Sequence, residues 1–257
     1  MKLATILPTH YLQLAKDDEM HMALAHLIGK DEEYTNFFKE RAAEGKYVIL
    51  DNGVVETGKP VAIEELVAKA KMIGASELII PDHFMNGEAT MESAIENVPY
   101  VRKHAPTLKI MVVPQGETIE EWLYFAKEII QMDIDTIGIP KVLTKLGGRD
   151  ARLEVLADLG HSLRGLAIHL LGCWENPLEL KLIAKAVSTG QILPVRSCDS
   201  AIAYAYAREN MSITSGERPT GAIDFSAKDA SIDKLLHNIM IWEDSVKLDK
   251  EKITVLK

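Results

Sequence analysis

The chain has 257 residues, of which 47% are hydrophobic and 26% are charged, and its formal net charge is −9. These values are those of an ordinary globular protein, long enough to bury the core of one large α/β domain. The negative balance argues against a simple nucleic-acid binder, because such affinity comes largely from lysines and arginines that neutralise phosphates.

Two further sequence features bear on the cellular compartment. No run of about 18 apolar residues occurs, so we expect no membrane span. The N-terminal stretch is interrupted by Pro8, Thr9 and His10 and lacks a small-residue cleavage site, which predicts a cytoplasmic protein without a signal peptide. The two cysteines, Cys173 and Cys198, have no C-x-x-C spacing, and we expect free thiols.

Short apolar runs alternate with longer amphipathic stretches along the whole chain. Each run is bounded by turn residues and is apolar on both faces, which predicts a buried parallel strand. The stretch after the first run is longer than one crossover helix needs, and it predicts extra helices around residues 18–45. The seven predicted strands are KLATILP (2–8), YVILDNG (47–53), ELIIPDH (77–83), LKIMVVPQG (108–116), DTIGIPK (135–141), LRGLAIHLLG (163–172) and ILPVRSCD (192–199).

The clearest helix is predicted over residues 118–132. Thr118 is a helix-capping residue with Glu121 three positions on, and large apolar side chains then recur at three- and four-residue spacing. A second helix is predicted to contain Pro177 in its first turn and to end before Gly190. Residues 231–246 predict the last helix.

Repeated strand–helix units imply a parallel sheet. Seven or eight such units in this length favour a closed (β/α)8 TIM-type barrel that forms a single domain over residues 1–257. An open doubly wound sheet is the alternative, but neither G-x-G-x-x-G nor the P-loop motif follows any predicted strand.

Polar residues follow almost every predicted strand. Such residues are often only turn formers or helix caps, and a single one means little. Several at the same end of a barrel predict an active site, because the loops after the strands build the active site of this fold. In chain order the strand-end residues are Asp51 with Asn52, Asp82 with His83, Gln115, Lys141, His169 and Asp199.

This set of residue types favours certain reactions. Carboxylates without a cluster of histidines and cysteines argue against a zinc hydrolase, although a magnesium site stays open. Paired carboxylates suit glycosidic chemistry, in which one attacks or stabilises the anomeric carbon and the other moves a proton. Lys141 opens a different class, a Schiff-base lyase or aldolase. A lone histidine such as His169 is more often a structural residue than an acid or base.

Five strand-end motifs, in this order, resemble those of the tRNA-guanine transglycosylase superfamily, which includes DNA transglycosylases of bacteria and phages that insert 7-deazaguanines. ILDNGVVETG (49–58) is similar to the family's Asp-Ser-Gly-Gly-Phe-Gln, and VVPQG (112–116) to its Val-Gln-Gly-Gly. IGIPK (137–141) is similar to Ile-Gly-Gly-Leu, HLLGCWENPLEL (169–180) to Tyr-Leu-Met-Gly-Val-Gly-x-Pro-x-Asp-Leu, and VRSCDSA (195–201) falls where the family's nucleophile strand occurs. The resemblance covers roughly residues 47 to 205.

The resemblance implies base exchange in a nucleic acid through a covalent aspartyl–glycosyl intermediate. Asp199 matches the nucleophile and Asp51 the general acid/base, while the base pocket would contain Asp82, Gln115 and the Gly138 backbone. His169, Lys141 and Arg196 would also contact the substrate. Apart from the resemblance, Lys141, Lys145 and Arg149 lie around a glycine pair and suggest a local basic rim, where Lys145 and Arg149 would contact the nucleic-acid backbone. The implied ligands are guanine or a 7-deazaguanine and the polymer, with no cofactor and no metal.

Two departures from the family bear on the polymer. The family's zinc motif, Cys-x-Cys-x2-Cys with a later histidine, is absent. The Pro-Thr-Arg that follows the nucleophile in tRNA enzymes is also missing, with Ser200 and Ala201 there instead. A short chain without this motif favours DNA over tRNA, and it would act in the host cytoplasm if a phage encodes it. The alternatives are a nucleoside or nucleotide N-glycosidase with water as the acceptor, the Lys141 lyase, and a non-catalytic partner subunit. The sequence leaves a homodimer open.

Overall fold

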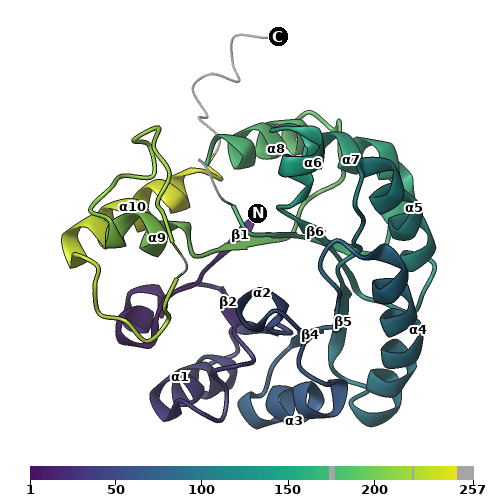
Figure 1. Cartoon of the computed structure of the whole chain (residues 1–257), viewed down its shortest axis with the longest axis horizontal. Helices are drawn as coiled ribbons and strands as arrows, with labels where there is room; N and C mark the ends of the chain where they lie inside the picture. Colours follow the sequence, from purple (N-terminus) through teal and green to yellow (C-terminus); the bar gives the residue numbers. More distant parts are fainter. Residues whose placement is uncertain (174–176, 222, 248–257) are drawn as a thin grey trace.

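The computed structural model describes residues 1–173, 177–221 and 223–247, which are built on one eight-stranded, all-parallel sheet (Figure 1). The strands pair in the order β1-β8-β7-β6-β5-β4-β3-β2, and β1 and β2, at the two ends of this order, lie against each other. The nearly closed sheet confirms the (β/α)8 TIM-type barrel. The strands are β1 (Lys2–Thr5), β2 (Met20–Ala23), β3 (Tyr47–Leu50), β4 (Glu77–Ile79), β5 (Lys109–Val112), β6 (Thr136–Pro140), β7 (Ala167–Leu171) and β8 (Ser197–Ser200).

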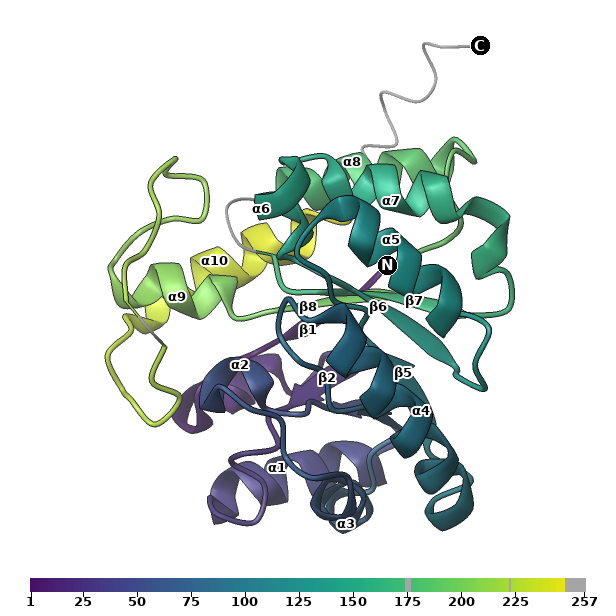
Figure 2. The ribbon, with the colours of Figure 1, turned by 45° about the vertical axis from the view of Figure 1, so that its right-hand side comes forward.

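The helices surround the barrel, as Figures 1 and 2 show from two sides. The short helix α2 lies over the open end of the barrel, and α9 and α10 pack against each other at the side of β1 and β8. The α-helices are α1 (Glu32–Ala43), α2 (Val54–Thr57), α3 (Ile63–Ile73), α4 (Gly87–His104), α5 (Ile119–Ile129), α6 (Leu143–Gly147), α7 (Ala151–Leu159), α8 (Leu178–Ser188), α9 (Ile202–Arg208) and α10 (Ile232–Asp244), with 3₁₀ helices at Thr9–Ala15 and Gly160–Leu163.

The predicted start of helix α5 is confirmed. The Thr118 side chain accepts a hydrogen bond from the Glu121 backbone N–H at 3.1 Å, which satisfies one of the unpaired donors of the first turn. Trp122 and Ile129 on its inner face are fully buried. In the described part of the chain no helix has both the length and the apolar content to cross a membrane.

The prediction of extra helices around residues 18–45 is wrong in part. The segment contains one α-helix, α1, and it also contains strand β2, whose residues Met20–Ala23 pair in parallel with Tyr47–Leu50. Its sequence, MHMA, has no β-branched residue and does not alternate, so it carries no local strand signal. The position between β1 and β3 makes it a strand, because every buried backbone group there must find a partner.

The seam between β1 and β2 is bridged by a side chain. Asp18, two residues before β2, accepts a hydrogen bond from the Thr5 backbone N–H at 3.3 Å. Burial raises the pKa of Asp18 to about 6, and the charge of Glu243 adds to this effect, while the hydrogen bond from Thr5 and the charge of Lys46 oppose it. A titratable group therefore lies where the barrel closes.

Candidate active site

The loops at the carboxyl ends of the strands enclose a cavity of about 700 Å³. It is bounded by α2, by the turns after β4 to β7, and by the loop of residues 219–226, apart from the undescribed residue 222, that follows α9. The structure brings six of the predicted site residues to its wall, namely Asp51, Asp82, Gln115, Lys141, Lys145 and Asp199. These residues come from five different strand ends, as the barrel prediction requires.

Asp199 lies in the cavity wall near the end of β8 and is 7% exposed. Its Oδ1 atom accepts a hydrogen bond from the Gly172 backbone N–H at 3.3 Å and lies 2.9 Å from His169 Nε2. The neighbouring Ser200 hydroxyl donates to the Cys173 carbonyl oxygen at 2.7 Å, which ties the end of β8 to the turn after β7. The strand therefore ends in a carboxylate whose orientation is held by two neighbours.

Asp51 lies directly after β3, and its Oδ2 atom accepts a hydrogen bond from the Gly53 backbone N–H at 2.9 Å. Gly53 has a φ of 79°, a conformation that glycine adopts without strain, and it begins helix α2. Burial raises the pKa of Asp51 well above its usual value, and the charges of Glu56, Asp82 and Asp199 raise it further. Such a carboxyl group retains a proton where an exposed aspartate would have lost it.

Asp82 lies between two side-chain amides. Asn52 Nδ2 donates to its Oδ1 atom, and Gln115 Nε2 donates to its Oδ2 atom, each at 2.5 Å. Burial raises the pKa of Asp82, although both hydrogen bonds oppose that shift. The Met85 backbone N–H donates to Gln115 Oε1 at 3.2 Å, which fixes the orientation of the amide. The three side chains form a hydrogen-bonded polar patch, of which Asp82 and Gln115 line the cavity.

The turn that carries Gln115 is held by a tryptophan. Trp122 Nε1 donates to the Pro114 carbonyl oxygen at 2.7 Å, and the Trp122 side chain is fully buried. A Cβ atom at Gly116 would lie 2.6 Å from the Trp122 backbone nitrogen, so only glycine fits at that position. The close approach of α5 to this turn therefore positions Gln115.

Two lysines, Lys141 and Lys145, line the cavity. Burial lowers the pKa of Lys141, while the charge of Asp199 opposes that effect and Lys145 reinforces it. Lys145 is exposed and lines the cavity from α6. Arg149 lies outside the cavity wall with its side chain 67% exposed, and its Nε is 3.5 Å from Asp150 Oδ1. The predicted basic rim thus divides into two cavity lysines and one outer arginine.

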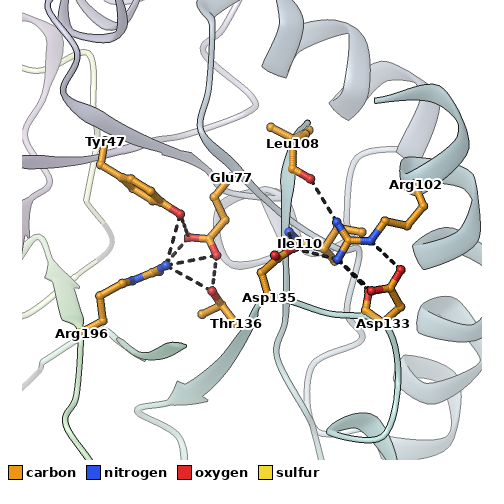
Figure 3. Close-up of polar contacts among 9 residues, drawn as sticks. All are labelled: Tyr47, Glu77, Arg102, Leu108, Ile110, Asp133, Asp135, Thr136 and Arg196. Carbon is orange, nitrogen blue, oxygen red and sulfur yellow. Dashed lines mark hydrogen bonds and ion pairs between the residues drawn. The ribbon is translucent and has the colours of Figure 1, made fainter. Parts of the chain in front are cut away.

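The prediction that Arg196 contacts the substrate is wrong. Arg196 precedes β8, at the amino end of the strands, and Figure 3 shows its guanidinium directed at Glu77. Its Nη2 atom is 2.7 Å from Glu77 Oε2, and Nη1 donates to the Tyr47 hydroxyl at 3.2 Å. The other arginine in Figure 3, Arg102, pairs with Asp133 and Asp135. Ser197 and Cys198 separate Arg196 from the cavity-lining Asp199, and the two ends of the strand lie on opposite faces of the barrel.

Two other predicted contacts lie below the cavity. Gly138 is in the middle of β6, and a Cβ atom there would lie 2.6 Å from Leu171 Cδ1 and 2.7 Å from Val113 Cγ2. Leu171 and Val113 fill the space that a side chain at Gly138 would occupy, and these two residues line the cavity. Gly138 itself is not part of the cavity wall. His169 is fully buried beneath Asp199, and the predicted direct contact with substrate is wrong for it too.

The structure adds residues to the wall that the sequence did not indicate. Glu56 on α2 lines the cavity. Burial of its carboxyl group raises its pKa, the charge of Asp199 adds to this shift, and the charge of Lys141 opposes it. Val55 and Phe84 also line the cavity and are 73% and 58% exposed. The one signal for Glu56 is its place between Gly53 and Gly58, which bracket a single helical turn.

Within the described residues, no group of three or more histidine, cysteine, aspartate or glutamate side chains is arranged to hold a metal ion. No protein-family model matches the chain, and no curated protein matches it. The cavity and its side chains are therefore the features of the molecule that bear on its function.

Proposed function

We propose that the protein is a glycosyltransferase that exchanges guanine for a 7-deazaguanine base at an N-glycosidic bond. One observation carries this proposal: a carboxylate oriented by a backbone N–H and a histidine shares a cavity with a second carboxyl group whose pKa is raised. Such a pair supplies the two groups that a double displacement needs, a carboxylate nucleophile and a proton donor.

In the proposed first step Asp199 Oδ2 attacks C1′, because both contacts described above are made by Oδ1. The C1′–N9 bond breaks, and Asp51 donates its proton to the departing base, which leaves a glycosyl ester on Asp199. In the second step N9 of the incoming base attacks C1′ and passes its proton to Asp51, and the ester bond to Asp199 breaks. Both residues return to their starting state.

The polar patch of Asp82, Asn52 and Gln115 suits the recognition of a guanine-like base. The Watson–Crick edge of guanine carries N1–H and N2–H₂ donors, and a carboxylate held by two amides is a fixed acceptor for them. Phe84 and Val55 at the mouth offer exposed apolar surface against which a base face can pack. The site thus combines edge recognition with stacking.

Nucleic acid is the proposed carrier of the base, with DNA favoured over tRNA. The target nucleotide would have to be flipped into the cavity, because the reacting carboxylate lies 7% exposed in its wall. Lys145 at the rim and Arg149 beyond it are the cations that would contact neighbouring phosphates.

A covalent-trapping assay tests the proposal. The protein is incubated with guanine-containing DNA or tRNA, and a denaturation-resistant adduct is sought on gels with the wild type, with Asp199→Asn, and with Asp158→Asn on the exposed face of α7 as a matched control. We expect an adduct with DNA for the wild type and the control, and none for Asp199→Asn. An adduct that persists in Asp199→Asn would refute the nucleophile, and no adduct with either polymer would refute the exchange reaction.

A second candidate follows from Lys141. A lysine that lines a cavity and has a lowered pKa is suited to form a Schiff base with a carbonyl substrate. Borohydride treatment in the presence of such a substrate would then give an irreversible adduct that is lost in Lys141→Gln.

A further inference from the structure

A buried chain of polar contacts runs along the inside of the barrel from the Arg196–Glu77 ion pair to Asp199. Arg196 Nε donates to Ser197 Oγ at 3.1 Å, Ser197 Oγ lies 2.8 Å from His169 Nδ1, and His169 Nε2 lies 2.9 Å from Asp199 Oδ1. His169 and Ser197 are fully buried, and they are direct partners in the register of β7 with β8. The chain connects the two ends of the barrel.

The positions of the hydrogens follow from the partners of Ser197. An arginine Nε can only donate, so Ser197 Oγ accepts from Arg196, and within the described part of the chain His169 Nδ1 is the one acceptor in reach of the Ser197 hydroxyl hydrogen. Nδ1 then acts as the acceptor, and the ring hydrogen is on Nε2, which donates to Asp199 Oδ1. Every polar atom between Arg196 and Asp199 is satisfied in this arrangement.

The ion pair between Arg196 and Glu77 agrees with these donor and acceptor roles. Glu77 is fully buried and balances Arg196 through a contact of 2.7 Å, so the guanidinium is held in place with its Nε directed at Ser197. Residues 197 and 199 both point into the barrel, because alternate residues of a strand share a face. The carboxylate of Asp199 thereby receives an N–H donor from below, which leaves its upper side for the cavity.

We propose that His169 is a positioning residue for the nucleophile: Ser197 and Arg196 fix it as the Nε2–H tautomer, and that N–H orients the Asp199 carboxylate toward the substrate. The proposal rests on the proposed function for its catalytic consequence. The tautomer itself is a property of the folded chain and can be tested without any substrate.

Nitrogen-15 NMR of protein labelled at histidine tests the tautomer. The His169 signals are assigned by their absence in His169→Gln. We expect one protonated and one unprotonated ring nitrogen, with Nε2 protonated, and in Ser197→Ala we expect this single-tautomer pattern to be lost. Protonation of both nitrogens, protonation of Nδ1 alone, or an unchanged pattern in Ser197→Ala would overturn the proposal.

Adduct formation tests the consequence. The glutamine amide of His169→Gln retains an N–H donor for Asp199, whereas His169→Leu removes it. We expect His169→Leu to slow adduct formation about 100-fold, the scale of a misplaced reacting group, with little change in KM, and His169→Gln to recover at least a tenth of the wild-type rate. Thermal unfolding confirms that both variants are folded.

Equal rates in the two folded variants would overturn the positioning role. Failure of the wild type to form any adduct would instead count against the proposed function, while the NMR pattern would still decide the tautomer. The two failures are therefore distinguishable.

Discussion

The carboxyl groups of Asp51 and Glu56 face one cavity from a single turn of chain, and the charge of Glu56 raises the pKa of Asp51. The turn is compact because Gly53 and Gly58 have φ values of 79° and 76°, and the Thr57 hydroxyl donates to the Gly53 carbonyl oxygen at 2.8 Å. Glu56 thus influences the group proposed to move the proton.

Glu56→Gln should shift the pH dependence of exchange. Removing the negative charge lowers the pKa of Asp51, so the limb of the kcat/KM profile that reports Asp51 should move toward lower pH. This direction holds whether Asp51 is acting as acid or as base. Profiles of the wild type and Glu56→Gln are compared with that of Glu64→Gln, an exposed change on α3. A limb that stays in place, or moves in both variants, would contradict the coupling.

Asp82→Asn should reduce the preference for guanine. The new amide has one acceptor oxygen where the carboxylate had two, and it offers a donor toward the N1–H and N2–H₂ groups. We expect kcat/KM for guanine to fall about 100-fold and the ratio of guanine to hypoxanthine, which lacks the 2-amino group, to approach one. Competition between the two bases in one reaction measures this ratio. An unchanged ratio would place base recognition elsewhere.

The paired change Lys145→Gln and Arg149→Gln should weaken DNA binding and flatten its salt dependence. Each phosphate contact that is lost should reduce the slope of log K against log salt by about one. Lys127→Gln, in the last turn of α5, is the matched control, since that helix end points to the amino end of the barrel. Affinity and slope equal to the wild type would show that both residues face away from the polymer.

Asp18→Asn should stabilise the protein at high pH. The pKa of Asp18 is raised from 3.8 to about 6, so its stabilising contribution is present below pH 3.8 and is lost as the pH rises through about 6. Asparagine avoids the buried charge and can still accept from Thr5 N–H. We expect a gain on the order of 2 kcal/mol at pH 8 and none at pH 3.5. Urea unfolding at both values measures it, with the exposed neighbour Asp17→Asn as control. An equal difference at both pH values would contradict the assignment.

Much of the fold and part of the site could be predicted because their signals are local. Seven strands were identified from compact apolar runs, and the residues that follow them, Asp51, Asp82, Gln115 and Lys141, do meet at one face. Parallel strands bring their carboxyl ends to the same side of a sheet, so chain order alone was enough to group these residues. Strand β2 was missed because its four residues carry no strand signal and depend on the strands beside it.

The depth of each side chain in the barrel was decided by the tertiary structure. The sequence predicts that three residues of neighbouring strands lie together, namely Asp199, His169 and Arg196. In the structure Asp199 lies at the cavity wall, His169 beneath it, and Arg196 at the opposite end of the barrel. Strand periodicity says which side chains point inward, but their layer depends on the stagger between strands, which no single segment encodes. The loop after α9 reaches the cavity because closure of the barrel brings the last strand, β8, against the first, β1. The order of residues along the chain shows which of them follow the strands, whereas closure of the sheet brings some of these residues together in one cavity.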